Sequence, residues 1–110
     1  KAPFIMVAQI NGKFIASAAL FLHDLDSRPD LSPWLGGVFT VPEYRGRGIA
    51  KTLMKKVLDT ARKLGYDKIY LHTEHTAELY QKLGWQKLCN TTTDQGETSE
   101  IYRLIINDRA

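Results

Sequence analysis

Cysteine is nearly absent from this chain of 110 residues, and long apolar runs are absent altogether. Cys89 is the single cysteine, so neither an intrachain disulfide nor a CxxC metal-binding pair can form. The longest apolar stretch, residues 14–22, has nine residues including Ser17, far short of the roughly 18 that suggest a membrane span. The first residues also lack the ordered regions of a signal peptide. These absences predict a chain of the cytoplasm that holds no metal and does not enter a membrane.

The excess of positive over negative charge is also small. The chain has 15 Lys and Arg against 12 Asp and Glu, a net charge of +3. This excess permits an anionic ligand but falls short of the basic footprint that nucleic-acid-binding domains usually show. The composition is 44% hydrophobic and 25% charged, which is typical of a globular domain with one core. We therefore expect a single domain over residues 1–110 that binds no nucleic acid.

The first third of the chain has strand patterns. An Asn11-Gly12 pair separates two β-rich runs within residues 3–23, and this pair is the strongest short-range signal for an antiparallel hairpin. A further strand is predicted over residues 34–41. Gly36-Gly37 interrupts it, which indicates a bulge or a close approach by another chain or a ligand.

The next segment has helical spacing. From Gly48 to Leu64 the apolar residues form one stripe on a helix of 3.6 residues per turn, and Gly65 follows as a C-terminal cap. A strand over residues 66–73 comes directly after, so strand, helix and strand predict a right-handed βαβ unit with parallel strands. The remaining elements are a helix over 76–83 and strands over 85–92 and 97–106. The expected fold class is therefore α/β, or α+β, with a mixed central sheet.

A loop with two arginines and two glycines precedes the long helix. A helix N-terminus exposes unpaired backbone N–H groups and carries about half a positive charge, so a phosphate fits there. Gly46 and Gly48 let the amides approach an anion without a Cβ in the way, and Arg45 and Arg47 can add charge-assisted hydrogen bonds. The loop is therefore interpreted as a diphosphate site, with a solvated basic turn or a nucleic-acid anchor as the alternatives.

Known phosphate motifs narrow this interpretation. The P-loop pattern GxxxxGK[ST] is absent, and the dinucleotide pattern GxGxxG fails because Lys51 stands at the third glycine. The pattern [Q/R]xxGx[G/A] does fit, from Arg45 to Ala50. With this loop, residues 38–73 and the downstream stretch AELYQKLGW resemble the GNAT superfamily of acyl-CoA-dependent N-acetyltransferases, with both motifs in the family's order.

The resemblance implies a fold, a cofactor and a set of binding residues. The fold would be the GNAT-like acyl-CoA N-acyltransferase fold, whose sheet has splayed strands, and the cofactor would be acetyl-CoA. The strand before the loop would hydrogen-bond the pantetheine arm, the loop would hold the diphosphate, and Lys51 is close enough to help. Relatives often carry an asparagine on the pantetheine arm where this chain has a threonine. The cofactor-binding residues expected on this basis are Phe39, Thr40, Val41, Arg45, Gly46, Arg47, Gly48, Ile49, Ala50, Lys51 and Thr73.

Catalysis would transfer the acetyl group directly to a primary amine. The resemblance assigns Tyr80 as the general acid that protonates the departing thiolate, and the alternative is a packed aromatic whose hydroxyl finds a partner. The general base is less defined, because the strand over 34–41 has no carboxylate. His72 and Glu74 are the candidates carried forward. The other groups on the same side are His75, His23 and Asp24, and deprotonation through water needs no dedicated base.

Two questions stay open at the level of sequence. By the resemblance, family members usually carry another strand and two helices ahead of the hairpin, and no such segment is seen here. The expectation is either a fragment or an acceptor side that is disordered or rebuilt. The acceptor is expected to be a small-molecule or peptide amine, and a homodimer is left open. The rival functions are a non-catalytic acyl-CoA-binding or regulatory module of the same fold and a small basic nucleic-acid-binding domain.

Overall fold

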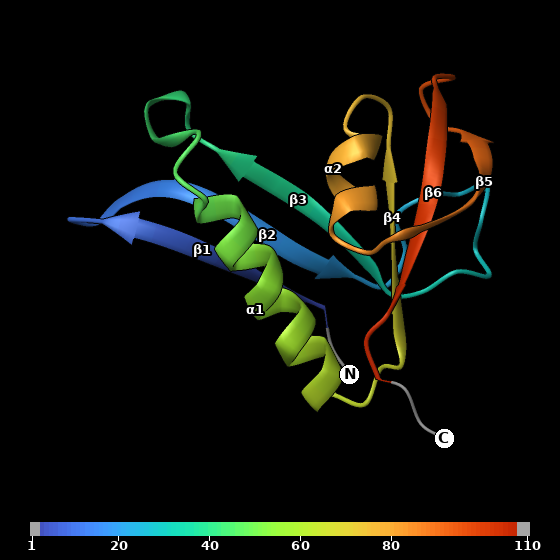
Figure 1. Cartoon of the computed structure of the whole chain (residues 1–110), viewed down its shortest axis with the longest axis horizontal. Helices are drawn as coiled ribbons and strands as arrows, with labels where there is room; N and C mark the ends of the chain where they lie inside the picture. Colours follow the sequence, from blue (N-terminus) through green and yellow to red (C-terminus); the bar gives the residue numbers. More distant parts are fainter. Residues whose placement is uncertain (1–2, 108–110) are drawn as a thin grey trace.

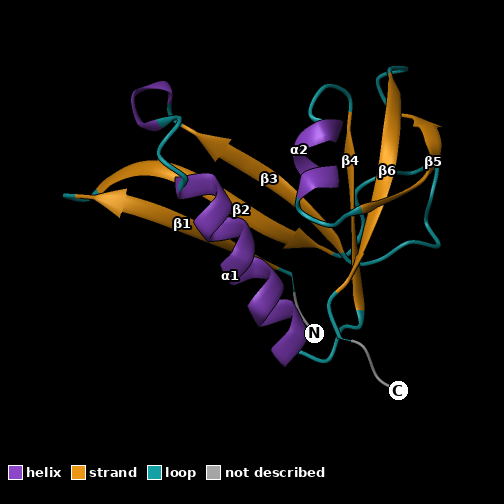
Figure 2. Cartoon of the chain, in the orientation of Figure 1, coloured by secondary structure: helices purple, strands orange, loops and turns teal. Residues whose placement is uncertain are grey.

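A six-stranded mixed sheet organises residues 3–107, the part of the chain that the computed structural model describes. The strand order is β1-β2-β3-β4-β6-β5 (Figure 1, Figure 2). The strands are β1 Phe4–Ile10, β2 Lys13–Phe21, β3 Trp34–Thr40, β4 Lys68–Thr73, β5 Gln86–Thr92 and β6 Thr98–Ile105. The helices are the short 3-10 turn η1 Pro42–Tyr44, α1 Ile49–Lys63 and α2 Ala77–Lys82. The predicted α/β class with a mixed sheet is confirmed.

The first three strands form an antiparallel meander. Asn11 and Gly12 both have positive φ, 51° and 78°, which is the backbone that a two-residue hairpin turn between β1 and β2 requires. The predicted bulge is found in the β2–β3 pairing, whose register shifts between Ser17 and Ala19. At Gly36 a Cβ would stand 2.8 Å from the Phe21 ring, so only glycine fits beneath this ring without a shift.

The β3-α1-β4 unit is parallel, as predicted. Its helix ends in a Schellman motif: the Gly65 N–H donates to the Arg62 carbonyl at 3.1 Å and the Tyr66 N–H donates to the Ala61 carbonyl at 3.1 Å. The amide of Tyr66 is thus used to close the helix. For this reason β4 begins at Lys68 rather than at residue 66, which corrects the predicted boundary.

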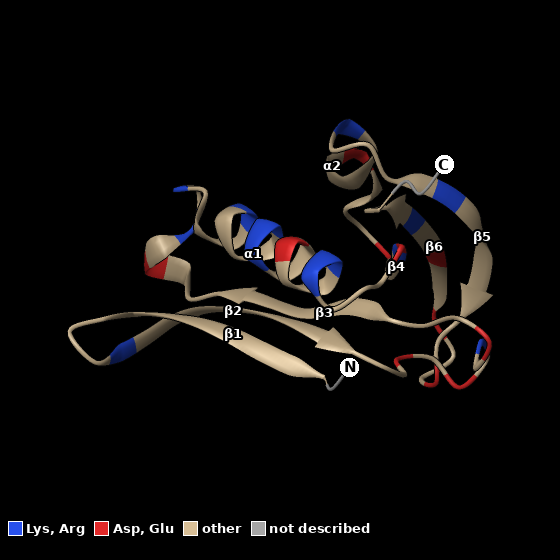
Figure 3. Cartoon of the chain, turned by 90° about the horizontal axis from the view of Figure 1, so that it is seen from below, with Lys and Arg blue, Asp and Glu red and all other residues tan. Residues whose placement is uncertain are grey.

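Both α-helices lie on one face of the sheet (Figure 3). The apolar stripe of α1 buries Leu53, Met54, Val57 and Ala61 against β2 and β3, so the main core lies between this helix and the sheet. The opposite face of the meander leaves apolar side chains in solvent, namely Ile5, Val7, Phe14 and Phe39. No helix within residues 3–107 combines the length and the apolar character needed to cross a membrane.

Candidate active site

The sheet opens between β3 and β4. Within residues 3–107, Trp34 and Tyr70 are the only paired residues of these two strands, and the Tyr70 N–H also donates to the Pro33 carbonyl at 3.0 Å. Beyond this point the strands diverge, with α2 beside the opening (Figure 1). A cavity of about 300 Å³ occupies the divergence, lined by Asp24, Leu35, Gly36, Gly37, Val38, Leu71, His72 and Tyr80. Two residues with candidate catalytic roles, His72 and Tyr80, therefore face one cavity.

The N-terminus of α1 is uncapped by any side chain of the described residues. The first intrahelical bond runs from the Thr52 N–H to the Gly48 carbonyl at 3.0 Å, so the amides of Ile49, Ala50 and Lys51 have no acceptor inside the helix. Gly46 and Gly48 have positive φ, 78° and 76°, and a Cβ at either would meet no atom within 4 Å. This space in front of free amides is what an anion requires.

A pocket of about 320 Å³ lies at this helix end. Seven of the predicted cofactor-binding residues line it together with Tyr44, Met54 and Leu79: Thr40, Arg45, Gly46, Gly48, Ile49, Ala50 and Lys51. Phe39, Val41, Arg47 and Thr73 are not among the lining residues. The structure thus gathers most of the predicted loop into one pocket and leaves four predicted residues outside it.

The two arginines of the loop are held by their neighbours. Arg45 donates from Nε to the Thr40 carbonyl at 2.9 Å and lies over the Phe39 ring at 5.9 Å. Arg47 lies over the Tyr44 ring at 4.9 Å and lines a different groove, between α1 and β1. These cation–π contacts direct each guanidinium, and the sequence could not have predicted them because they depend on the course of the loop.

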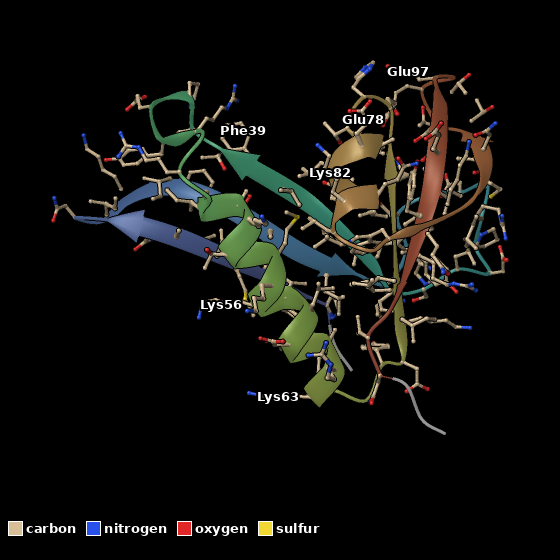
Figure 4. The ribbon with its side chains drawn as sticks, in the orientation of Figure 1. Phe39, Lys56, Lys63, Glu78, Lys82 and Glu97 are labelled. Carbon is tan, nitrogen blue, oxygen red and sulfur yellow. The ribbon has the colours of Figure 1, made fainter. Side chains whose placement is uncertain are left out.

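The backbone of β3 directs the Thr40 amide away from β2. The Val41 N–H donates to the Ile15 carbonyl at 2.8 Å, so Val41 and Phe39, two residues apart, direct their backbone groups toward β2. In an antiparallel ladder the residue between them points the other way. The N–H of Thr40 therefore faces the open side of β3. Phe39 lies at the far end of the strand (Figure 4), and its ring stacks on Phe14 at 6.2 Å.

Thr73 is used within its own turn. It is 8% exposed, its hydroxyl lies 2.7 Å from the Thr76 hydroxyl, and it accepts the Thr76 N–H at 3.1 Å. This local bonding is typical of threonine at the start of a turn that leads into a helix. The Thr73 hydroxyl, which was expected to contact the cofactor, is thus already hydrogen-bonded to Thr76 in the turn before α2.

Tyr80 is half-buried beside the opening. Its ring meets Trp85 edge-on, with centroids 6.1 Å apart, which fixes the plane of the phenol. Burial raises the pKa of the Tyr80 hydroxyl, and a hydrogen bond with Thr76 opposes this rise only in part. The phenol is therefore protonated at neutral pH, as a proton donor must be.

His72 is the centre of a polar network on the other side of the cavity. Its Nε2 lies 3.1 Å from Asp24 Oδ2, and its Nδ1 lies 3.2 Å from Ser99 Oγ. Ser99 Oγ in turn lies 3.4 Å from Glu74 Oε2. The hydrogen bond to Asp24, with the nearby carboxylates of Glu74 and Asp94, raises the pKa of His72 above its usual 6.5 although burial acts against it.

Sequence reasoning found part of this network. Both base candidates belong to it, and Asp24 was placed near the same opening. Ser99 was missed, because it lies 27 residues after His72 and nothing in its own sequence context distinguishes it. Only the pairing of β4 with β6, which sets His72 opposite Ile101, brings the two side chains to one place.

The fold and the open strand pair define the architecture of acyl-CoA N-acyltransferases. A family model described as the acetyltransferase (GNAT) family matches residues 1–85. The chain belongs to this family, which confirms the resemblance seen in its motifs.

Two N-acetyltransferases are similar to the chain in sequence. The chain is 34% identical over 86 residues to N-alpha-acetyltransferase 30 of Schizosaccharomyces pombe, covering 74% of the chain and 57% of the relative. It is 45% identical over 49 residues to N-acetyltransferase 8B of Homo sapiens, covering 41% of the chain and 22% of the relative. The chain therefore spans little more than half, or less, of the length of these relatives.

Solved structures show the same fold. An aminoglycoside 6'-N-acetyltransferase complexed with coenzyme A superposes with a TM-score of 0.80 at 14% identity, covering 98% of this chain and 75% of that protein. The structure of yncA from Salmonella typhimurium with its cofactor acetyl-CoA gives a TM-score of 0.74 at 18% identity, with coverages of 96% and 66%. Both neighbours were crystallised with coenzyme A or its acetyl thioester.

Proposed function

We propose that this chain carries the acetyl-transfer site of an N-acetyltransferase, which moves the acetyl group of acetyl-CoA directly to a primary amine. The observation that carries the proposal is the arrangement of two cavities along β3 and α2. The pocket at the α1 amides includes Thr40 and Leu79, and the cavity at the opening includes Val38 and Tyr80, their near neighbours on the same elements. A ligand with a diphosphate and a long thioester arm matches this layout.

The residues of the first pocket fit the cofactor. Amides of Ile49, Ala50 and Lys51 would hold the diphosphate, with the positive glycine φ values keeping their approach open. The N–H of Thr40 would bond the pantetheine arm as a neighbouring strand would. Bound acetyl-CoA supplies an acetyl group activated as a thioester.

Tyr80 would act at the thiol end of the reaction. Its hydroxyl gives a proton to the departing thiolate, and it is suited to this because burial keeps it protonated. The acceptor amine would enter from the side of His72 and Glu74, the candidate bases. The single cysteine, on β5, does not line the cavity at the opening, so a route through a covalent acetyl-cysteine is not invoked.

Replacement of the phenol tests the acid role. We expect Tyr80→Phe to lower kcat by about 10²-fold, the lower end of what a general acid contributes, while the affinity for coenzyme A stays unchanged. Thiol release with acetyl-CoA and a panel of amines measures kcat, and calorimetric titration measures the affinity. The panel should include peptide N-termini and an aminoglycoside, the acceptor types that the names of relatives suggest. A Tyr80→Phe protein as fast as the wild type would remove the phenol from the mechanism.

A non-catalytic acyl-CoA-binding module is the second candidate. It is favoured by one observation, namely that β3, WLGGVFT, has no carboxylate that could serve as a base. This candidate predicts binding of acetyl-CoA without thiol release for any amine in the panel.

A further inference from the structure

The His72 imidazole is held at both of its ring nitrogens. Nε2 faces the Asp24 carboxylate at 3.1 Å, and Nδ1 faces the Ser99 hydroxyl at 3.2 Å. The ring edge is also fixed from the side, because the Trp34 ring meets it at 76° with centroids 5.9 Å apart. The side chain of His72 is 20% exposed and borders the cavity at the opening. Its orientation is therefore set by three partners on separate segments of the chain.

The chemistry of these partners decides where the proton of a neutral His72 lies. An ionised carboxylate only accepts hydrogen bonds, so Asp24 requires a hydrogen on Nε2. A hydroxyl can either donate or accept, so Ser99 tolerates Nδ1 with or without a hydrogen. When Nδ1 carries no hydrogen, Ser99 donates to it. When Nδ1 carries one, Ser99 accepts it and turns its own hydrogen toward Glu74, 3.4 Å away.

We propose that Asp24 is a positioning residue that fixes the Nε2–H tautomer of His72, so that Nδ1 is the nitrogen that takes a proton of the acceptor ammonium through Glu74 and Ser99. The role in transfer rests on the proposed function, whereas the tautomer does not. Ser99 and Glu74 stabilise the imidazolium that forms, because Ser99 accepts the Nδ1–H and donates to Glu74.

The proton step is balanced. An N–H bond of the acceptor ammonium breaks, its electron pair stays on the amine nitrogen, and the proton bonds to Glu74 Oε2. From there it passes to Ser99 Oγ while the Ser99 hydrogen passes to Nδ1, so the O–H bond that breaks at Ser99 is replaced by a new one. Because the Glu74 side chain is 28% exposed and Ser99 is 1% exposed, the proton then leaves to solvent along Ser99 and Glu74. The resulting neutral amine attacks the thioester.

The charges around His72 favour this role. Asp24 faces it from the β2–β3 connection, Glu74 from the end of β4, and Asp94 from the β5–β6 turn. These groups stabilise the imidazolium, which raises the pKa of His72 and makes it a stronger base. The value of kcat/KM should then rise with pH, and the midpoint of this rise, the acid limb of the pH profile, should lie above the usual histidine pKa of 6.5.

Nitrogen NMR of the protein tests the tautomer without any turnover. In the neutral state we expect the His72 Nε2 resonance to have the shift of a protonated nitrogen and Nδ1 that of an unprotonated one. His72→Gln assigns the signals among the three histidines. A neutral His72 with its hydrogen on Nδ1 overturns the proposal. The expected tautomer in a protein that acetylates no amine would instead count against the proposed function alone.

The pH profile of kcat/KM tests the role in transfer. We expect Asp24→Asn to move the acid limb to lower pH and to lower the plateau by about tenfold or more, since it removes the charge that strengthens the base. Asp26→Asn, an exposed carboxylate of the same loop, is the matched control and should leave the limb in place. Thermal unfolding confirms that both variants are folded. An unmoved limb in Asp24→Asn, or a limb that persists in His72→Gln, overturns the proposal.

Discussion

Single side chains at the site serve the fold and the chemistry at once. Thr73 closes a turn, Arg45 lies on an aromatic ring of its own strand end, and His72 joins the β2–β3 connection to β4 through Asp24. Motif matching identified these positions, but it could not tell which atoms would already have partners. The number of free hydrogen-bonding groups at a position, rather than its residue type, determines what it can offer a ligand.

The pairing of His72 with Asp24 makes stability depend on pH. The folded-state pKa of His72 is raised, mainly by the hydrogen bond to Asp24, so the folded chain binds the proton more tightly than the unfolded chain. This stabilisation is fully present below the unfolded pKa of 6.5 and is lost as pH rises through the folded pKa. The cost of His72→Gln should therefore be largest in mild acid and smaller in mild base.

Urea unfolding of the wild type and of His72→Gln from pH 5.5 to 8.5 measures this cost. His75→Gln provides the comparison, since His75 is exposed. A cost of His72→Gln that grows with pH would contradict the assignment of the raised pKa.

At the scale of elements, the β3-η1-α1 segment supplies the backbone amides of the pocket that we propose for the diphosphate. The strand would contribute the Thr40 N–H and the helix three amides. Arg45 lines the pocket but donates from Nε to the Thr40 carbonyl, and Arg47 lies on the Tyr44 ring beside a different groove. Lys56 and Lys63 project from the side of α1 (Figure 4), and Lys56 lines the groove between α1 and β1. Glycine conformation should consequently matter more to cofactor binding than any one basic side chain.

Two glycines with the same backbone geometry separate the effect on folding from the effect on binding. Gly48 and Gly12 have φ of 76° and 78°, and a Cβ at either meets no atom within 4 Å. We expect Gly48→Ala and Gly12→Ala each to lower the free energy of unfolding by about 1–2 kcal/mol, because alanine resists this conformation. Only Gly48→Ala should weaken coenzyme A binding, since its methyl group stands before the amides. Calorimetric titration and denaturant unfolding compare the two, and equal affinities would argue against an anion at this helix end.

At the scale of the whole molecule, one contact region joins two half-sheets. The meander β1-β2-β3 and the group β4-β6-β5 meet where Trp34 pairs with Tyr70, and a small cluster of Leu25, Leu31 and Ile101 packs around them. The Trp34 Nε1–H donates to the Leu31 carbonyl at 2.8 Å inside this cluster. The opening for the proposed reaction exists because the strands are held together there and diverge beyond it.

Trp34→Phe tests how strongly this junction depends on the buried hydrogen bond. The change leaves the Leu31 carbonyl unpaired in a region where Trp34 is 0% exposed, which costs about 1–3 kcal/mol beyond the loss of ring area. Trp85→Phe is the matched control, because Trp85 is 5% exposed and its indole makes no hydrogen bond with the described residues. Chemical denaturation compares the two. Equal losses of stability would show that the hydrogen bond contributes little to the junction.

The residue pattern by itself determined the elements, their order and the glycine-rich loop before α1. Hairpin, amphipathic helix and glycine-rich helix start are local features, and the periodicity and turn chemistry of neighbouring residues are sufficient to specify them. The start of β4 differed by two residues from expectation, because the Schellman motif at the end of α1 used the amide of Tyr66.

Tertiary structure alone decided the composition of the site. Asp24, His72, Glu74 and Ser99 come from three separate segments, and they meet because β4 pairs with β6 and diverges from β3. Which groups share a hydrogen bond depends on strand register and on the course of a loop, and both are set by packing across the whole sheet. The sequence therefore indicated Asp24, His72 and Glu74, while the fold decided that they join Ser99 in one hydrogen-bonded network.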